Sequence, residues 1–396
     1  MKLPVDLTPL LPEITAVRRD IHAHPELSFN EFRTSDLVAE KLQSWGIEVT
    51  RGLGKTGVVG RLCNGTGTKA IGLRADIDAL PIHERNQFAH RSQHAGRMHA
   101  CGHDGHTAML LAAAAHLARQ RNFNGTVHFI FQPAEEGGAG GKAMVDDGLF
   151  TRFPCDAIFA LHNWPGLQVG EFAVKPGPMM ASSNEFEIRI TGKGAHAAMP
   201  ELGIDPIVIG AQIVTALQTL VARTLKPTDT GVVSVTQFHA GGDATNVIPN
   251  EAVLRGTVRA FKPEVVDLLE AGMRRIVEHT ATALGASAQL DFIRNYPATF
   301  NDPAQAEFVA QVLDDLVGAR NVLRDHEPSM GSEDFSYMLQ QRPGAYLWIG
   351  NGDGSHRTAG HGVGPCMLHN PSYDFNDALL PLGANVWIKL VERFLS

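Results

Sequence analysis

The chain has 396 residues, of which 44% are hydrophobic and 19% are charged. This composition is typical of a globular protein rather than a disordered one, and the length predicts two domains. The formal net charge of -8 argues against the basic surface with which proteins bind nucleic acids or anionic membranes. We therefore expect neither as a partner.

The cysteines and the first residues bear on the cellular compartment. Cys63, Cys101, Cys155 and Cys366 show no paired spacing, which favours a reducing compartment over a disulfide scaffold. The first six residues lack the apolar core of a signal peptide. We also expect no apolar run long enough to span a bilayer. Together these features predict a cytoplasmic protein.

The first half of the chain alternates helical and strand patterns. Amphipathic or apolar helices are predicted for residues 8–23, 31–45 and 107–120. Apolar strands are predicted for residues 58–62, 70–74, 126–131 and 157–161. This alternation predicts an α/β domain with a mixed, mostly parallel sheet flanked by helices. In such sheets, ligands bind beyond the carboxyl ends of the strands.

The pattern changes after Pro178. Strands are predicted for residues 185–191, 231–238, 252–260 and 287–293, and helices for residues 205–225 and 263–284. The order β-α-β-β-α-β is that of a ferredoxin-like α+β domain. Helices and a strand at 345–350 follow, with a last helix from Asn376. We predict a discontinuous larger domain of residues 1–181 and 297–396, with an inserted domain of residues 182–296.

Side chains able to bind metal lie where predicted strands end or a helix begins. They are Cys101 and His103 before the third helix, Glu135 and Glu136 after one strand, His162 after another, and His369 near the end. Thiolate, imidazole and carboxylate donors with an open position for water are the parts of a hydrolytic metal site. The donors suffice for two metal ions if one ligand bridges. Because neighbours in an extended segment point to opposite sides, one glutamate of the pair can bind metal while the other faces substrate.

Each of these residues also has a structural interpretation. A single buried cysteine is more often a small apolar side chain than a ligand, and the chain has 18 histidines. Two other activities stay open. In one, Cys101 is a nucleophile activated by His103, and activity survives metal removal. In the other, the protein binds metal without catalysis, although the spare carboxylate of the glutamate pair argues against this.

Five segments resemble motifs of the M20 metallopeptidase superfamily. They are RRDIHAHPEL (residues 18–27), RADIDALP (74–81), HACGHD (99–104), QPAEE (132–136) and MGSEDF (330–335). The resemblance covers nearly the whole chain and is to the branch of aminoacylases, hippurate hydrolases and auxin-conjugate amidohydrolases. It implies a catalytic α/β domain and an inserted ferredoxin-like lid that often forms dimers.

The resemblance also implies a site with two divalent metal ions. Cys101 is the bridging ligand, and the shell is completed by His103, Glu136, His162 and His369. Glu135 is the general base and acid. Asp76 does not bind metal itself but orients one of the ligands. Thiolate and imidazole donors favour Zn, and Mn, Co or Ni also suit this mixed set.

The inserted domain carries three further candidates. His196 is expected to stabilise the developing oxyanion, from its own chain or from a partner subunit. Asn246 is expected to bind the backbone or carboxylate of the substrate, and Arg259 to clamp that carboxylate with two hydrogen bonds. Their structural interpretations are a loop residue, ordinary turn chemistry and a solvated strand residue.

The expected reaction is hydrolysis of the amide bond of an N-acyl amino acid to a carboxylic acid and a free amino acid. Glu135 takes a proton from metal-bound water and then protonates the leaving amine. Hippurate-like aroyl conjugates are the first expected substrates, followed by N-acetyl amino acids, N-acetyldiaminopimelate and indole-acetyl conjugates. A carboxypeptidase or dipeptidase of the same superfamily is the alternative. The expected partners are this small-molecule substrate and further copies of the chain, in a homodimer or higher homo-oligomer.

Overall fold

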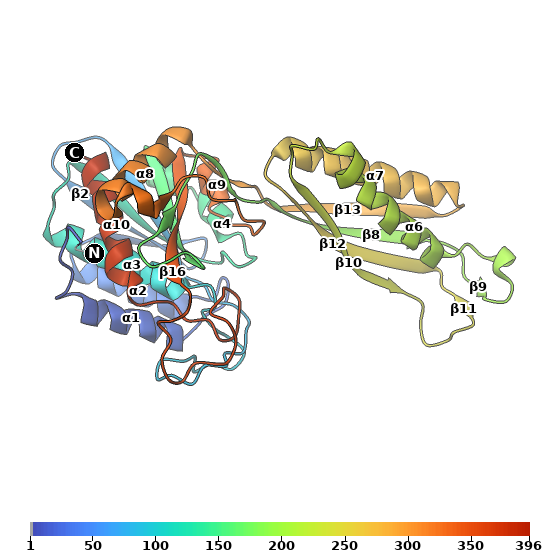
Figure 1. The fold of residues 1–396 in the computed structure, drawn as a ribbon, viewed down its shortest axis with the longest axis horizontal. Coiled ribbons are helices and arrows are strands. Elements are labelled where there is room, and N and C mark those ends of the chain that lie inside the picture. Colours follow the sequence, from blue (N-terminus) through green and yellow to red (C-terminus); the bar gives the residue numbers. More distant parts are fainter. Residues whose placement is uncertain (1–2) are drawn as a thin grey trace. The chain divides into compact units, whose positions relative to one another are not determined.

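The computed structural model describes residues 3–396, which form two compact units (Figure 1). The larger unit contains the chain up to Met179 together with Phe300–Glu327 and Asp334–Ser396. The smaller unit contains Met180–Thr299 and also Pro328–Glu333. The sequence prediction had placed this last segment in the larger domain. Ala181 explains the difference, because its backbone N–H bonds the carbonyls of Ser329 at 3.0 Å and Gly331 at 2.9 Å.

A mixed sheet of eight strands forms the centre of the larger unit, in the order β1-β2-β4-β3-β5-β16-β6-β15. The strands are Glu48–Leu53 (β1), Gly57–Asn64 (β2), Ala70–Asp76 (β3), Gly125–Gln132 (β4), Ala157–Pro165 (β5), Phe172–Ala173 (β6), Val322–Leu323 (β15) and Gly344–Gly352 (β16). The four neighbours β4, β3, β5 and β16 run parallel. The predicted fold class is confirmed. The strand β1 was missed because only one of its six residues, Leu53, is buried.

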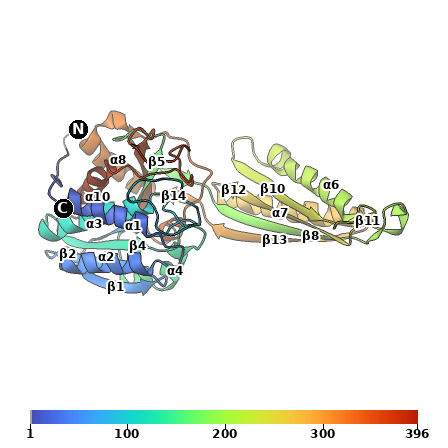
Figure 2. The same cartoon turned by 90° about the horizontal axis from the view of Figure 1, so that it is seen from below.

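Helices pack on this sheet through one large apolar core (Figure 2). The core takes side chains from α1 (Leu11–Ala23), α2 (Phe32–Ser44), α3 (His103–Arg119), α8 (Pro303–Val317) and α10 (Leu379–Phe394). Shorter helices are α4 (Gly140–Asp146), α5 (Leu149–Arg152) and α9 (Ser336–Leu339), with a 3-10 turn at Ala319–Asn321. The centre of the core is α3, whose residues are all buried up to Ala115. Its run of alanines lets neighbouring helices approach closely.

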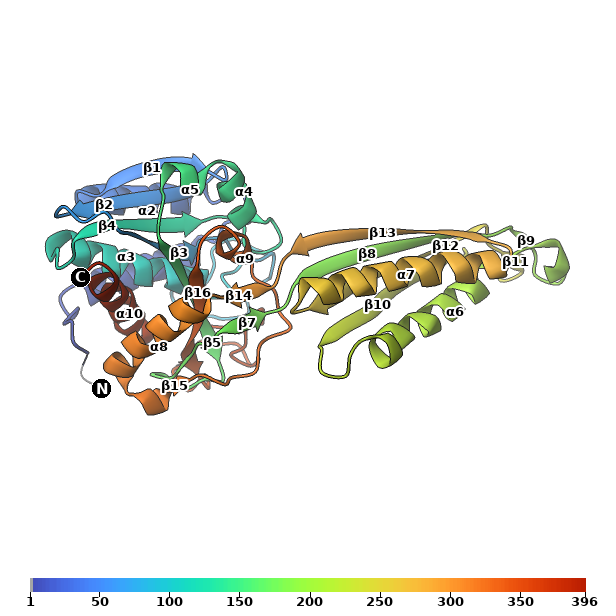
Figure 3. The same cartoon turned by 90° about the horizontal axis from the view of Figure 1, so that it is seen from above.

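The smaller unit is an antiparallel sheet of four strands in the order β10-β12-β8-β13. The strands are Ser183–Thr191 (β8), Gly231–Ala240 (β10), Glu251–Ala260 (β12) and Ser287–Tyr296 (β13). The helices α6 (Pro206–Thr219) and α7 (Pro263–Ala283) lie side by side and share one apolar core with the sheet (Figure 3). The chain therefore follows the predicted β-α-β-β-α-β order. Short elements complete the fold: β9 (Ala195–His196) with β11 (Val247–Ile248), β7 (Gly177–Met180) with β14 (Thr299–Asn301), and a 3-10 turn at Pro200–Leu202.

One apolar segment differs from the expectation that no run is long enough to span a bilayer. Helix α6 continues through a π turn, Leu220–Thr224, and the segment Pro206–Thr224 is long and apolar enough to do so by length and composition alone. Its buried side chains, which include Ile209, Ile213 and Leu217, belong to the core of the smaller unit. Other apolar side chains, such as Val208, are exposed.

Candidate metal centre

The predicted metal ligands of the larger unit come from four separate segments that meet beyond the carboxyl ends of the parallel strands. Helix α3 begins at His103, four residues earlier than the sequence predicted, because Gly102 adopts the left-handed backbone conformation (φ 94°) that starts the helix. Cys101 lies directly before this glycine. Glu136 follows β4, His162 lies on β5, and His369 lies in the loop before α10.

The structure brings all five predicted ligands together. Ligand atoms of Cys101, Glu136 and His369 lie within 4.8 Å of one another. The Nε2 atom of His369 is 3.3 Å from Oε1 of Glu136, and Nε2 of His103 is 4.0 Å from the same oxygen. The sulfur of Cys101 is 3.4 Å from Nε2 of His162. The five side chains therefore form one cluster, and Glu135 joins it within 4.8 Å of His103 and Glu136.

Two of the imidazole rings are held with one nitrogen directed into the cluster. Nδ1 of His103 donates to the backbone carbonyl of Asp78 at 2.9 Å and approaches its Oδ1 at 3.2 Å. Nδ1 of His162 donates to the carbonyl of Asn163 at 2.7 Å. With its proton on Nδ1, each ring can present Nε2 to a metal ion, which is the form that binds metal. Nε2 of His103 is buried and has no hydrogen-bond partner among residues 3–396.

The electrostatics of the cluster favour a bound cation. Burial, together with the carboxylates of Glu136, Glu135 and Asp76, raises the pKa of the Cys101 thiol well above its ordinary value. A cation in contact with the sulfur offsets this effect and stabilises the thiolate. Burial and the neighbouring His106 ring lower the pKa of His162, so that its imidazole stays neutral. The donor set and the unpartnered nitrogen of His103 therefore fit divalent metal ions.

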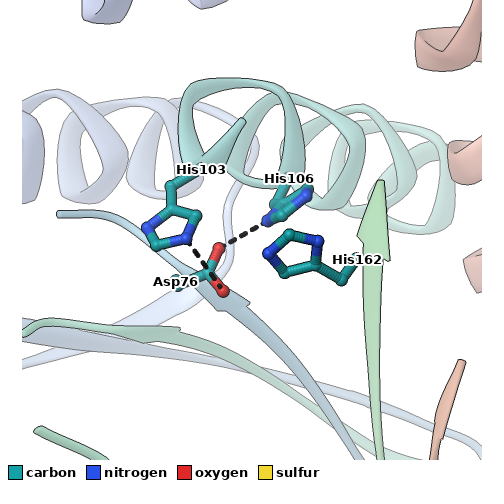
Figure 4. Close-up of side chains that lie close together, drawn as sticks. All are labelled: Asp76, His103, His106 and His162. Atoms are coloured by element: carbon teal, nitrogen blue, oxygen red, sulfur yellow. Dashed lines mark hydrogen bonds and ion pairs between the residues drawn. The ribbon is translucent and has the colours of Figure 1, made fainter. Parts of the chain in front are cut away.

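Asp76 lies against the histidines of the cluster, among them His106, which the sequence analysis did not select (Figure 4). Asp78 is a second residue that it did not select. Oδ1 of Asp76 accepts from Nδ1 of His106 at 2.6 Å, and its Oδ2 accepts from Arg74 at 2.7 Å. Asp78 holds Nδ1 of His103, while Oδ2 of Asp76 lies 3.8 Å from Nε2 of the same ring. Simple spacing points to both missed residues, because His106 lies one helical turn after His103 and Asp78 shares the side of Asp76 in an extended segment.

The three candidates of the smaller unit do not form one group. His196 and Asn246 are adjacent, because the backbone N–H of Ala197 bonds the carbonyl of Asn246 at 2.9 Å, and both side chains are exposed. Arg259 lies at the other end of the unit, near the last residue of β12, where it donates to Thr257 at 2.5 Å. The ten residues of β12 separate the two places by roughly 30 Å.

A family model, Peptidase family M20/M25/M40, matches residues 72–393. The chain belongs to this family. Curated relatives match most or all of the chain: hippurate hydrolase of Campylobacter jejuni is 40% identical and is covered completely, as is this chain. IAA-amino acid hydrolase ILR1-like 4 of Arabidopsis thaliana is 39% identical, covering 96% of this chain and 86% of the relative.

A solved M20 structure has the same fold. It is the Bacillus subtilis YXEP protein, described as a dinuclear metal binding peptidase, with a TM-score of 0.83 and 34% identity. The match covers 98% of this chain and 99% of the other. The resemblance to the M20 superfamily inferred from sequence motifs is thereby confirmed.

Proposed function

We propose that this protein is a metal-dependent amidohydrolase that cleaves N-acyl amino acids to a carboxylic acid and a free amino acid. Full-length relatives that hydrolyse hippurate and IAA-amino acids support this activity. The structural observation that carries the proposal is Glu135, a spare carboxylate placed beside the ligand cluster and only 8% exposed. A protein that only stored metal would not need it.

In this proposal, Cys101, His103, Glu136, His162 and His369 would hold two divalent ions, with Cys101 as the ligand shared between them. When bound, the ions polarise the substrate carbonyl and acidify a water molecule. Glu135 takes the proton from the attacking water and delivers it to the nitrogen of the leaving amine, so that the carboxylate is regenerated. The Bacillus subtilis neighbour is described as a dinuclear metal binding peptidase, which supports a dinuclear site. Zn is the first candidate metal, with Mn, Co or Ni as alternatives.

The segment that carries the glutamate pair is rigidly held. The backbone N–H of Ala134 donates to Oε1 of Glu31 at 2.9 Å, and the N–H of Glu136 donates to Oδ2 of Asp78 at 3.0 Å. Ala134 has a positive φ of 52°, which a residue with a side chain adopts only when its surroundings impose it. Glu135 therefore has a fixed backbone from which to transfer protons.

The geometry argues against the rival in which Cys101 is a nucleophile activated by His103. The imidazole within hydrogen-bonding distance of the sulfur is that of His162, at 3.4 Å. Burial and three carboxylates raise the pKa of the thiol, which is the opposite of the low pKa that reactive cysteines have.

Two variants test the amidohydrolase proposal. Glu135→Gln keeps the metal ligands, so we expect unchanged metal content and turnover of hippurate reduced roughly 10²- to 10⁴-fold. Glu136→Gln is the matched control, which should lose metal as well as activity. Metal analysis of each purified protein and a screen of N-acyl amino acids provide the measurements. Normal turnover by Glu135→Gln, or full activity after chelation, would contradict the mechanism.

The stacked rings of Trp164 and Trp348, here called the aromatic wall, support aroyl conjugates as the first class of substrate. Trp164 follows His162 by two residues on β5, so both side chains lie on the same face of the sheet. The Trp164 ring is half-buried and stacks on the buried ring of Trp348, with centroids 3.9 Å apart. An aromatic acyl group can stack on the exposed part of this ring. N-acetyl amino acids, N-acetyldiaminopimelate, indole-acetyl conjugates and peptides remain the alternative substrates.

The smaller unit supports a homodimer or higher homo-oligomer, and we propose that this assembly is cytoplasmic. Exposed apolar side chains on α6, including Val208 at 53%, lie beside β10, which is an edge strand. Large apolar surfaces and unpaired strand edges are features that a second copy covers. Because His196 and Arg259 lie at opposite ends of the unit, a partner subunit is the simpler source of one of them. We therefore propose that His196 stabilises the oxyanion and the adjacent Asn246 binds substrate in the partner's site, while Arg259 binds substrate in its own subunit.

A further inference from the structure

Two polar side chains of the segment RRDIHAHPEL, Arg18 and His22, are buried in the interior of the larger unit. The proposed reaction uses neither of them. Arg18 is 1% exposed. Its guanidinium contacts three carboxylates: Asp104 at 3.4 Å, Asp374 at 3.4 Å and Asp377 at 2.7 Å. These carboxylates come from two segments that are some 270 residues apart in the sequence.

The first carboxylate belongs to the segment that carries Cys101 and His103. Asp104 is the second residue of α3 and directly follows His103. Its Oδ2 also lies 2.9 Å from Nδ1 of His22, whose Nε2 is 3.2 Å from Oε1 of Glu84. With both ring nitrogens facing carboxylates, His22 completes the contacts that hold Asp104.

The other two carboxylates follow His369 in the loop before α10. Asp374 lies five residues after His369 and is also held by Nε2 of His361 at 3.0 Å. His369 itself has a φ of 63°, a left-handed conformation that is unfavourable for any residue with a Cβ. Its backbone N–H donates to the carbonyl of Ala100 at 2.8 Å, next to Cys101. The surrounding contacts must therefore hold this loop in place.

We propose that Arg18 is a positioning residue that sets the separation between the two halves of the metal centre, with Cys101 and His103 on one side and His369 on the other. It acts through Asp104 and Asp374 and touches no metal ligand side chain itself. The inference rests on the proposed metal centre but is independent of the substrate.

Chemistry distinguishes this role from simple stabilisation. Removing buried charges from water costs so much free energy that apolar side chains of similar volume stabilise a fold as well or better. A planar guanidinium, however, directs several hydrogen bonds at fixed angles, which a lysine ammonium cannot do. Arg18 therefore provides a geometric constraint between three carboxylates rather than only a favourable charge.

The test compares Arg18→Lys with Arg19→Lys in the full-length protein loaded with Co²⁺. Arg19 is the matched control because it also binds Asp377, at 2.8 Å, but is 50% exposed and contacts neither Asp104 nor Asp374. Transfer of Co²⁺ to a competing chelator gives the affinity, and the visible absorption of thiolate-bound Co²⁺ reports the geometry at Cys101. Circular dichroism and urea titration identify conditions in which each variant is fully folded.

We expect folded Arg18→Lys to bind Co²⁺ roughly 10- to 100-fold more weakly, the usual loss when a group supporting the ligands is changed. Arg19→Lys should match the wild type. If Arg18→Lys does not fold, His22→Gln provides a second variant, with an expected loss in the same direction. A folded Arg18→Lys with wild-type affinity would overturn the proposal, as would wild-type affinity in His22→Gln if Arg18→Lys does not fold. Failure of the wild type to hydrolyse N-acyl amino acids would count only against the proposed reaction.

Discussion

Substitution of Asp78 tests how the larger unit orients its proposed metal ligands. Its carbonyl and Oδ1 hold Nδ1 of His103, while Oδ2 accepts from the backbone N–H of Glu136 and from the hydroxyl of Ser28, each at 3.0 Å. One carboxylate therefore orients one proposed ligand and the backbone of another. Asp78→Asn keeps the shape of the side chain but replaces one acceptor oxygen with a donor.

The structure sets the size of the expected effect. If the amide NH₂ takes the place of Oδ2, it faces the N–H of Glu136, and one charge-assisted hydrogen bond worth about 1.5 to 3 kcal/mol is lost. If the amide is turned, its NH₂ faces Nδ1 of His103, which already carries a proton for the carbonyl of Asp78. Either orientation disturbs one ligand. At about 1.4 kcal/mol per tenfold change, we expect metal affinity to fall by roughly 10- to 100-fold.

The assay is competition between the protein and a chelator for Zn²⁺, together with kcat/KM for hippurate at saturating metal. Asp156→Asn is the control, because Oδ2 of Asp156 accepts from the N–H of Ala70 at 2.7 Å, at the opposite end of β3. It removes a similar hydrogen bond away from the cluster and should leave metal affinity unchanged. An affinity of Asp78→Asn within twofold of wild type would refute the reasoning.

Three further predictions concern specificity, stability and packing. Trp164→Leu should lower kcat/KM for N-benzoylglycine about 2- to 10-fold more than for N-acetylglycine, because ring stacking is lost; equal losses would remove the aromatic wall from the acyl site. Burial opposes the charge of His22, but Asp104 and Glu84 raise its pKa to about 10. Since this lies above the unfolded value of 6.5, the stabilisation is complete below pH 6.5 and is lost as pH rises through 10. Urea titrations should then show the stability advantage of wild type over His22→Gln falling by on the order of a few kcal/mol across that range, and a constant difference would contradict the charged ring. Gly383→Ala should lower the free energy of unfolding by about 1 to 3 kcal/mol, because the new Cβ would collide with the sulfur of Met109 on α3; an unchanged urea midpoint would show that the two helices can separate at little cost.

Much of the fold could be predicted because local sequence patterns carry it. The smaller unit is the clearest case, because in β8 the buried Phe186, Ile188 and Ile190 alternate with more exposed polar residues. This period of two identifies a strand without knowledge of its partner strands. Polar β1 and the start of α3 were predicted less well. The helix begins at His103 because Gly102 adopts a left-handed backbone, which the residue type permits but does not require.

The types of metal-binding side chain, their order and their placement at strand ends are properties of the sequence by itself, because donor chemistry belongs to each residue and strand ends follow from local periodicity. Only the tertiary structure brought Cys101 to His369, assigned Asp78 to His103 and Asp76 to His106, and enclosed Arg18 between Asp104 and Asp374. These contacts join segments far apart in the chain. Their geometry depends on how the sheet and α3 pack, and no local pattern encodes that packing.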